Sequence, residues 1–293
     1  MPELQTSDAF EWVRYPWGQA LRCRPLADIA HHCFTTRRPV IPSGDGVTGD
    51  AWHAVALAFG LPRHAIVRLR QVHGAGVMTT RRTDAIRESI GEWGAADAAV
   101  TDNAAVVLSV RVADCVPLLI GDRRTGAAAA VHAGWRGAAS GVVTATVREL
   151  GSAFSANPAD LVAAVGPSIG PCCYRVGPEL RDHYLEAGHP MDAIERWFTP
   201  SPPVVARRGV PGSEPGLPDG RAPLWLNMWS VVSDSLVLAG LAAEHVHVAR
   251  LCTSCGRDVF HSYRVDGPAA GRMVGVIRVG PTRGSAPTSR RRH

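Results

Sequence analysis

Two histidines and one cysteine are the residues of this sequence best suited to chemistry. His73, Cys115 and His132 each end a short apolar run and are flanked by small or rigid residues. Zinc binds imidazole nitrogen and thiolate sulfur, and catalytic zinc sites commonly use three protein ligands and leave a fourth position to water or substrate. We therefore expect these side chains to surround one zinc ion. Their intervals are too long for a zinc finger, so spacing alone equally allows a buried cysteine and two hydrogen-bonded histidines.

The same residues allow two other kinds of protein. A cysteine beside a histidine is the nucleophile of cysteine hydrolases, with Cys115 attacking and His132 or His73 acting as its base. A scaffold that is stabilised by metal and binds a partner is the non-enzymatic alternative. Metal content separates the zinc enzyme from the cysteine hydrolase. If Cys115→Ser removes bound zinc, Cys115 is a metal ligand. If the protein is active without metal and iodoacetamide traps Cys115, that cysteine is a nucleophile.

The residues that follow His132 suit an anionic or polar ligand. Gly134 and Gly137 leave the backbone accessible, Trp135 gives an apolar wall, and Arg136 offers a planar fork of donors at a strand-to-helix junction. An ordinary helix start with a surface arginine is the alternative interpretation.

The remaining cysteines are harder to assign. Cys252 and Cys255 form a Cys-x-x-Cys pair that suits a redox pair, half of a zinc site or a structural role, and no second such pair accompanies it. Cys172 and Cys173 are adjacent, which disfavours a disulfide, and we expect them to pack in the core. The neighbouring histidines at 31 and 32 point to opposite sides of an extended chain and form no paired metal site.

The elements that must position these residues are predicted from hydrophobic patterns. Short connections between the central strands cannot hold crossover helices, so we expect these strands to pair largely antiparallel. Helical periodicity, with Val143, Val147 and Leu150 on one face, predicts helices over 137–150, 178–187 and 229–241. The predicted strands are 98–101, 106–112, 116–121, 127–132, 160–165, 245–250 and 271–279.

These elements predict one α/β or α+β domain over residues 1–280. No internal repeat and no linker divides the sequence. A Pro/Gly-rich stretch at 199–223 predicts a surface loop or insertion, and residues 281–293 predict a disordered basic tail.

Composition narrows the class of partner and the compartment. Four arginines of the tail supply most of the net charge of +5, so we expect no specific nucleic-acid binding. The apolar runs are shorter than the roughly 20 residues of a membrane helix, and residues 1–8 do not resemble a secretory signal. Seven cysteines in a chain of this size favour reduced thiols and a soluble, cytoplasmic protein. Nothing in the sequence specifies an oligomeric state.

Ordered motifs over roughly residues 30–280 resemble the YfiH family, also called laccase-domain or multifunctional purine nucleoside phosphorylase proteins. The motifs are FTTR (34–37), RQVHG (70–74), DAAVT (97–101), VADCVPLL (112–119), VHAGWRG (131–137), VGPSIGPCCYRVG (165–177), CTSC (252–255), FHSYRVDG (260–267) and GRM (271–273).

The resemblance implies a layered α/β/β/α sandwich with largely antiparallel or mixed sheets, and it places the zinc ligands on His73, Cys115 and His132. The implied activities are phosphorolysis of adenosine, inosine, guanosine and methylthioadenosine, with purine nucleoside and phosphate as ligands, and deamination of adenosine. Some members are described as copper-dependent polyphenol oxidases, so copper is the alternative metal, although the motifs lack the pattern of a true multicopper oxidase.

Two segments depart from the family pattern. Residues 38–49 replace the usual Gly-Gly-Val-Ser and Asn-Leu-Gly segments, so the loop beside Arg37 is predicted to be rebuilt. Leu226-Asn227-Met228 stands where Leu-Asp-Leu is usual, which removes a carboxylate.

The implied activities assign hypothetical roles to three further residues. For deamination, zinc lowers the pKa of a bound water, and Asp114 either shuttles the proton or orients a ligand or a backbone amide. For phosphorolysis the attacking group is phosphate, and Arg37 and Arg136 are its predicted ligands.

Overall fold

The computed structural model describes residues 4–39, 50–85, 92–203 and 221–280. The predicted loop at 199–223 therefore falls largely outside the described residues, and the predicted tail at 281–293 falls entirely outside them. Within these ranges, no helix combines the length and apolar character that crossing a membrane requires. The helices are α1 (Arg24–Ala27), α2 (Asp50–Ala58), α3 (Trp135–Ala139), α4 (Val142–Phe154), α5 (Pro178–Glu186), α6 (Met191–Trp197), α7 (Met228–Leu238) and α8 (Tyr263–Asp266).

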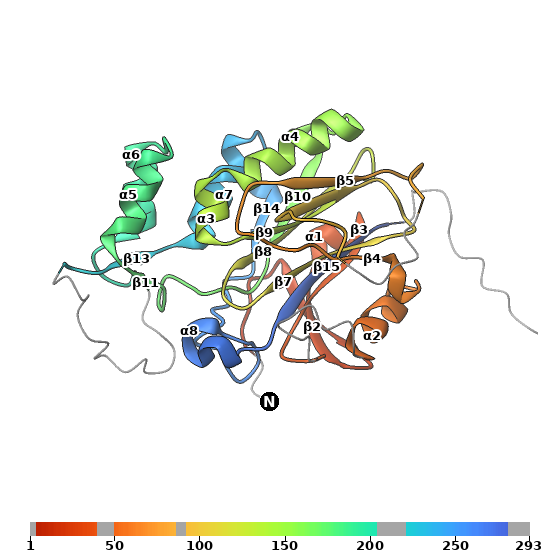
Figure 1. Cartoon of the computed structure of the whole chain (residues 1–293), viewed down its shortest axis with the longest axis horizontal. Coiled ribbons are helices and arrows are strands. Elements are labelled where there is room, and N and C mark those ends of the chain that lie inside the picture. Colours follow the sequence, from red (N-terminus) through yellow and green to blue (C-terminus); the bar gives the residue numbers. More distant parts are fainter. Residues whose placement is uncertain (1–3, 40–49, 86–91, 204–220, 281–293) are drawn as a thin grey trace, which may run out of the picture.

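The described strands form two six-stranded mixed sheets and one small sheet (Figure 1). The first sheet has the order β1 (Phe10–Tyr15), β2 (Gly18–Cys23), β3 (Ala30–Thr35), β15 (Met273–Val279), β7 (Val107–Val112) and β4 (Ile66–Val67). The second has the order β14 (Val246–Val248), β10 (Leu161–Val165), β8 (Val116–Asp122), β9 (Ala128–Ala133), β6 (Ala98–Thr101) and β5 (Val77–Thr80). The small sheet has the order β11 (Arg175–Val176), β13 (Leu224–Leu226) and β12 (Phe198–Thr199).

Alternating side chains divide the core into three layers. On β8, Leu118 and Ile120 pack toward the helices α4 and α7, whereas Leu119 packs between the two large sheets. On β15, Val276 instead joins Trp52 of α2 on the outer face of the first sheet. Because both faces of β8 are buried, its sequence is a continuous apolar run over residues 116–120 rather than an alternating one. The order helix, sheet, sheet, helix confirms the predicted α/β/β/α class.

Two features of the central region differ from the sequence prediction. The four central strands do not form one sheet, because β7 pairs with β15 and β4 in the first sheet, whereas β8 pairs with β9 and β10 in the second. The predicted helix at 137–150 is two helices, since Gly141 has a left-handed φ of 82° that ends α3 before α4 begins. The turn between β7 and β8 crosses from one sheet to the other, and it carries Asp114 and Cys115.

The altered Leu-Asn-Met segment has a structural explanation. Asn227 is the N-cap of α7, and its side-chain oxygen accepts a hydrogen bond from the backbone N–H of Ser230 at 3.2 Å. Asparagine and aspartate serve nearly equally well at this position. The missing carboxylate therefore leaves the start of α7 capped.

Candidate metal centre and its pocket

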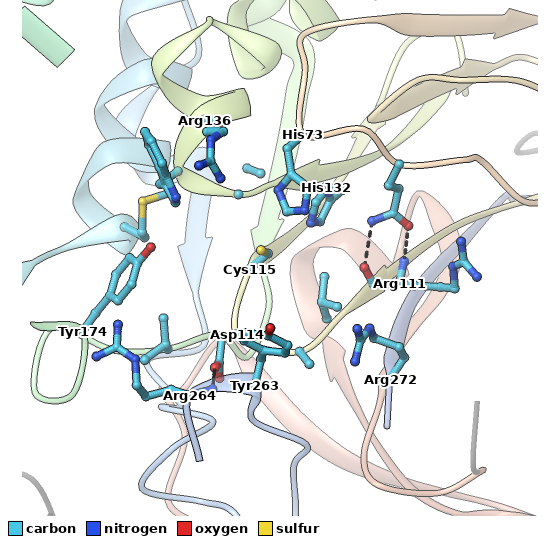
Figure 2. A pocket seen from close by; sticks show the side chains of 18 residues that line it. His73, Arg111, Asp114, Cys115, His132, Arg136, Tyr174, Tyr263, Arg264 and Arg272 are labelled. Carbon is cyan, nitrogen blue, oxygen red and sulfur yellow. Dashed lines mark hydrogen bonds between the residues drawn. The ribbon is translucent and has the colours of Figure 1, made fainter. Parts of the chain in front are cut away.

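Three segments that are distant in sequence bring His73, Cys115 and His132 together (Figure 2). His73 lies in the loop between β4 and β5, Cys115 in the sheet-crossing turn and His132 near the end of β9. Their ligand atoms all lie within 4.8 Å of one another. The two imidazole rings meet edge to face, with centroids 4.8 Å apart. The geometry thus gathers two nitrogen donors and one sulfur donor around one point.

Glycines allow this close approach. A Cβ atom on Gly134 would lie 2.7 Å from Nδ1 of His73 and 3.2 Å from Sγ of Cys115. A Cβ on Gly137 would lie 2.8 Å from the carbonyl oxygen of Gly74. Any larger residue at 134 would therefore push the triad apart, which explains why glycine follows the strand that carries His132.

Asp97 is the central residue that the sequence analysis did not identify. Its fully buried carboxylate accepts a hydrogen bond from Nδ1 of His132 at 2.8 Å. The same carboxylate also accepts hydrogen bonds from the backbone N–H of His73 at 2.9 Å and from the backbone N–H groups of Val72 and Gly74 at 3.1 and 2.7 Å. A carboxylate behind a histidine ligand fixes its tautomer and leaves Nε2 for the metal. The residue begins the DAAVT motif, which was the available signal.

Burial and neighbouring charges shift the histidines in opposite directions. Burial, helped by His132, lowers the pKa of His73, so its imidazole is neutral and able to bind metal. Burial also disfavours the charged form of His132, but the Cys115 thiolate and the Asp97 carboxylate outweigh it and raise that pKa to about 9. A metal ion that binds His132 therefore competes with a proton.

Unusual backbone conformations occur at the triad. His73 has a φ of 58° and Asp114 a φ of 84°, both in the left-handed region that residues with a Cβ rarely adopt. Such conformations persist where the surroundings enforce them, and they concentrate at functional sites. The hydrogen bond from the backbone N–H of His73 to Asp97 holds the conformation of His73. Hydrogen bonds from Thr253, Ser262 and the backbone N–H of Arg264 to the Asp114 carboxylate hold the conformation of Asp114.

The triad opens into a pocket of about 660 Å³, a size typical of small-molecule sites. Its walls combine aromatic and cationic side chains from both large sheets and from the first residues of α3 and α8. The lining residues are Gln71, His73, Arg111, Val112, Ala113, Asp114, Cys115, His132, Ala133, Gly134, Trp135, Arg136, Ile169, Tyr174, Met228, Tyr263, Arg264 and Arg272.

Positive charge dominates this lining. Arg111 is paired with Glu92 at 2.9 Å. Arg264 and Arg272 donate to backbone carbonyl oxygens, which leaves their charge uncompensated by these contacts. Arg136 is exposed and stacks on the Trp135 ring at 4.2 Å, and among the described residues its guanidinium meets no hydrogen-bond acceptor. The pocket thus offers cationic donors to an anionic ligand.

Asp114 is the only carboxylate among the lining residues, and three donors occupy it. Its oxygens accept hydrogen bonds from Oγ1 of Thr253 at 2.5 Å, from Oγ of Ser262 at 3.1 Å and from the backbone N–H of Arg264 at 2.6 Å. These bonds tie the sheet-crossing turn to the segment that supplies Arg264 and Tyr263. A carboxylate held in this way supports the structure of the pocket wall.

Arg37, the second predicted phosphate ligand, does not line this pocket. Its Nη1 donates to the carbonyl oxygens of Arg257 and Phe260 at 2.6 and 3.1 Å and lies 3.8 Å from Asp266. The structure therefore brings together five of the six predicted site residues, and Arg37 is the exception. The unpredicted lining residues Tyr174 and Arg264 come from the Val-Gly-Pro and Phe-His-Ser-Tyr motifs that carried the resemblance.

The donor chemistry of the triad fits a metal ion. Two imidazoles and a thiolate suit zinc or copper, and the buried carboxylate behind His132 is the usual supporting partner of a metal-bound histidine. Fold and site together define a mixed α/β protein with a candidate metal centre beside a cationic pocket.

The chain belongs to the family described as multi-copper polyphenol oxidoreductase laccase, whose model matches residues 48–280. It is 31% identical over 224 residues to the purine nucleoside phosphorylase YlmD of Geobacillus stearothermophilus, covering 75% of this chain and 74% of that protein. It is 37% identical over 202 residues to a purine nucleoside phosphorylase of Streptomyces coelicolor, covering 62% of this chain and 79% of that protein.

Solved structures agree with these relationships. The chain superposes on the Bacillus licheniformis hypothetical protein YfiH with a TM-score of 0.75 and 26% identity, covering 93% of this chain and all of that one. For YlmD of Geobacillus stearothermophilus the TM-score is 0.73 at 27% identity, with 94% of this chain covered.

Proposed function

We propose that the chain is a zinc-dependent purine nucleoside phosphorylase, acting on adenosine, inosine, guanosine and methylthioadenosine, and that it also deaminates adenosine. One observation carries the proposal: the triad of His73, Cys115 and His132 lies in the wall of a pocket that is also lined by arginines. The relatives named purine nucleoside phosphorylase support the substrate class. Phosphorolysis needs a bound phosphate, and the cationic lining supplies its ligands.

His73, Cys115 and His132 would hold the zinc ion, which when bound supplies a Lewis acid beside the substrate. Asp97 keeps the His132 ring in the tautomer that leaves Nε2 free for that role. The neutral imidazole of His73 and the thiolate of Cys115 complete the donor set.

In phosphorolysis, an oxygen of phosphate forms a bond to C1′ of the ribose while the glycosidic carbon–nitrogen bond breaks. The bonding electron pair leaves with the purine, which takes up a proton, and ribose 1-phosphate is the second product. Arg136 is the primary phosphate ligand in this proposal, because its guanidinium is accessible and meets no hydrogen-bond acceptor in the part of the chain that the structure describes. Arg264 and Arg272 add positive charge to the same walls.

Aromatic side chains give the purine its apolar surroundings. Trp135, Tyr174 and Tyr263 line the pocket beside the arginines. Burial raises the pKa of Tyr174, so its hydroxyl keeps its proton and is available as a donor to the base. Planar rings and one fixed donor suit recognition of a heteroaromatic base.

Deamination replaces the exocyclic amino group of adenosine by the oxygen of water, with release of ammonia. Of the two roles considered for Asp114, the positioning role is the better supported, because three donors already occupy its carboxylate. We assign it to holding the loop of Arg264 against the sheet-crossing turn.

The proposal is tested by incubating the purified protein with adenosine, with and without inorganic phosphate, and separating the products. Adenine and ribose 1-phosphate are expected only with phosphate, and inosine is expected in both samples. Cys115→Ser should lose both activities together with its zinc, whereas the matched variant Cys23→Ala, at a buried cysteine outside the site, should keep them. Absence of every product in the wild-type protein would refute the proposal.

A cysteine hydrolase is the second candidate, and one observation favours it. Asp97, His132 and Cys115 form a chain in which the carboxylate orients the imidazole and the imidazole contacts the thiol. This arrangement activates a nucleophilic cysteine in other enzymes. Zinc-free protein that remains active and loses its activity on alkylation of Cys115 would establish this candidate instead.

The family description names copper and polyphenol oxidation, which defines a further experiment. The protein loaded separately with zinc and with copper is assayed with adenosine under anaerobic conditions. Zinc-dependent turnover without oxygen supports the phosphorylase. Turnover of phenols that needs copper and oxygen would support the oxidase.

A further inference from the structure

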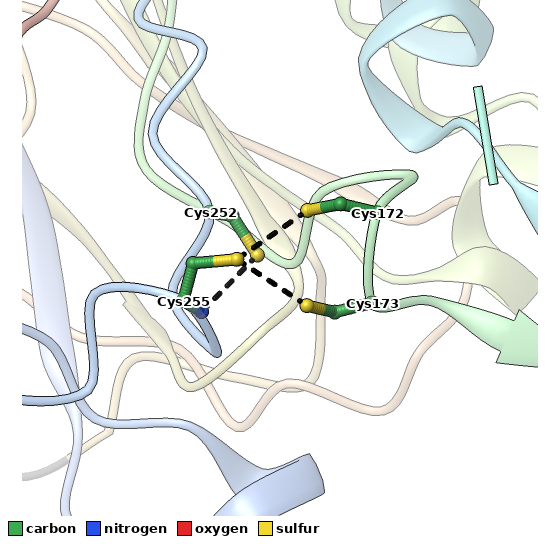
Figure 3. A group of neighbouring side chains, drawn as sticks. All are labelled: Cys172, Cys173, Cys252 and Cys255. Carbon is green, nitrogen blue, oxygen red and sulfur yellow. Dashed lines mark hydrogen bonds between the residues drawn. The ribbon is translucent and has the colours of Figure 1, made fainter. Parts of the chain in front are cut away.

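A second cluster of potential metal ligands lies outside the triad (Figure 3). The thiol groups of Cys172, Cys173, Cys252 and Cys255 all lie within 4.8 Å of one another. Sγ of Cys255 is 3.6 Å from that of Cys172 and 3.4 Å from that of Cys173. None of the four is joined in a disulfide. The adjacent pair therefore does not simply pack in the core as expected, because it faces the Cys-x-x-Cys pair.

Strand pairing explains how the two cysteine pairs meet. β10 and β14 are parallel neighbours, and the pairing continues as a bridge between Ser168 and Cys252. The segments that follow these strands therefore run side by side. A tight turn, in which the N–H groups of Cys173 and Tyr174 both donate to the carbonyl of Gly170, directs both adjacent thiols to the same side.

The spacing of the sulfur atoms suits tetrahedral coordination. With zinc–sulfur bonds of about 2.3 Å, the sulfur atoms of a four-thiolate site lie roughly 3.8 Å apart. The separations of 3.4 and 3.6 Å from Sγ of Cys255 lie slightly below this value, and no two of the four sulfur atoms are more than 4.8 Å apart. Four thiolates leave no open position, which is the coordination of a structural site rather than a catalytic one.

Donors and a cation surround the cluster. The backbone N–H of Gly170 points at Sγ of Cys252 at 3.2 Å, and that of Cys255 points at the same sulfur at 3.5 Å. Such donors stabilise a thiolate. The Arg264 guanidinium donates to the carbonyl oxygen of Cys173. This positive charge partly compensates the charge that four thiolates around a divalent ion would leave.

We propose that these four cysteines bind a second zinc ion, separate from the His73, Cys115 and His132 triad, and that this site is structural. A disulfide between any two of them would leave two further thiols pressed against it. Coordination uses all four at once, and soft thiolates select zinc among the divalent ions available to most proteins.

The cluster is connected to the pocket wall. Thr253, between the two cysteines of the pair, donates to the Asp114 carboxylate. Tyr174, which lines the pocket, directly follows Cys173. A metal held by the four cysteines would thus fix the two segments that position Asp114 and Tyr174, so its loss should loosen the pocket.

The test is zinc stoichiometry in protein purified from zinc-supplied cultures. We expect close to two zinc ions per wild-type chain and one in the double variant His73→Ala/Cys115→Ser, which leaves the cysteine cluster intact. The double variant Cys252→Ser/Cys255→Ser should also hold one. Cys23→Ala, at a buried cysteine outside both sites, should retain two.

A spectroscopic measurement avoids dependence on the folding of the cysteine variants. His73→Ala/Cys115→Ser reconstituted with Co²⁺ should show the visible absorption and sulfur-to-cobalt charge-transfer bands of tetrathiolate coordination. If the His73→Ala/Cys115→Ser protein binds no metal, the proposal is overturned. Intact-protein mass and peptide mapping that reveal a disulfide among the four cysteines would also overturn it. Neither outcome depends on nucleoside turnover, so this inference and the proposed function fail independently.

Discussion

The carboxylate of Asp97 lies 2.8 Å from Nδ1 of His132 and simultaneously accepts the backbone N–H of His73 at 2.9 Å. One buried anion therefore fixes the ring of one histidine of the triad and the backbone of the other. The arrangement couples the end of β9 to the loop after β4, and it aims both imidazoles at Cys115. In the proposed metal site Asp97 is a positioning residue, because its effect on a bound ion would pass through the two histidines.

Asp97→Asn should weaken zinc binding by roughly 10- to 100-fold, the usual effect of changing the partner behind a metal-bound histidine. The amide keeps one acceptor oxygen but presents N–H₂ to a donor. Competition with a chelator of known affinity measures the change. Asp102→Asn is the matched control, because Asp102 follows the opposite end of β6 and pairs with the exposed Arg82 rather than with the triad. Equal zinc affinity in wild type and Asp97→Asn would contradict the positioning role, whatever happens to melting temperature.

Gly134→Ala should disrupt the triad without straining the backbone. Gly134 has φ −72° and ψ 164°, which alanine adopts readily, but the new Cβ would lie 2.7 Å from Nδ1 of His73. We expect zinc at this site to fall well below stoichiometry and kcat/KM to fall at least tenfold, equivalent to about 1.4 kcal/mol. Gly76→Ala is the control, since its Cβ would meet atoms only at 3.7 Å and beyond. Full zinc content in Gly134→Ala would show that the triad tolerates a Cβ atom at this position.

His32 should make stability depend on pH. Burial lowers its pKa to about 4, and the ring is held neutral between the N–H of Cys23 and the carbonyl of Ala30. In the unfolded chain the imidazole protonates near pH 6.5. Between these values unfolding takes up a proton, so the free energy of unfolding should fall as pH is lowered from about 6.5 to 4, by about 3 kcal/mol.

Chemical denaturation across this pH range measures the effect. His32→Gln keeps a side-chain acceptor for Cys23 but takes up no proton, so the stability difference between wild type and variant should shrink as the solution is acidified. His53→Gln, at an exposed position on α2, is the control and should preserve the wild-type dependence. A difference that stays constant with pH would show that His32 is not the responsible group.

The triad was predictable because its members are chemically distinctive and lie in recognisable motifs. Asp97 was not, although it begins a quoted motif, because its role depends on register. His132 and Asp97 face one another only because β6 and β9 pair antiparallel, with the N–H of His132 on the carbonyl of Asp97. No local pattern in either segment specifies that partner.

Tertiary pairing also accounts for the other differences between the sequence prediction and the structure. Hydrophobic patterns located β7 and β8 but could not assign them to different sheets, since nearly every residue of both strands is buried and neither pattern specifies a partner strand. The cysteine cluster required the parallel pairing of β10 and β14, two strands separated by several helices. Arg37 was predicted from its motif, and only the packing of its segment against the Arg257 to Phe260 turn shows where its guanidinium points.

Arg136 offers the sharpest test of phosphate binding. Arg136→Ala should raise the KM for phosphate by 10- to 100-fold, about 1.4 to 2.7 kcal/mol, because a charge-assisted pair is lost. The melting temperature should stay close to that of the wild type, since the side chain is exposed, stacks on Trp135 and forms no ion pair among the described residues. Arg136→Lys should give an intermediate KM, because it keeps the charge and loses the planar fork.

The control for this series is Arg148→Ala, at an exposed arginine of α4 that does not line the pocket. Arg148→Ala removes the same net charge. A loss of phosphate affinity that both alanine variants share therefore reports the general electrostatic field of the protein. A loss confined to Arg136→Ala reports a direct ligand. Initial rates over a range of phosphate at saturating nucleoside distinguish these cases, and an unchanged KM for phosphate in Arg136→Ala would remove this residue from the proposed site.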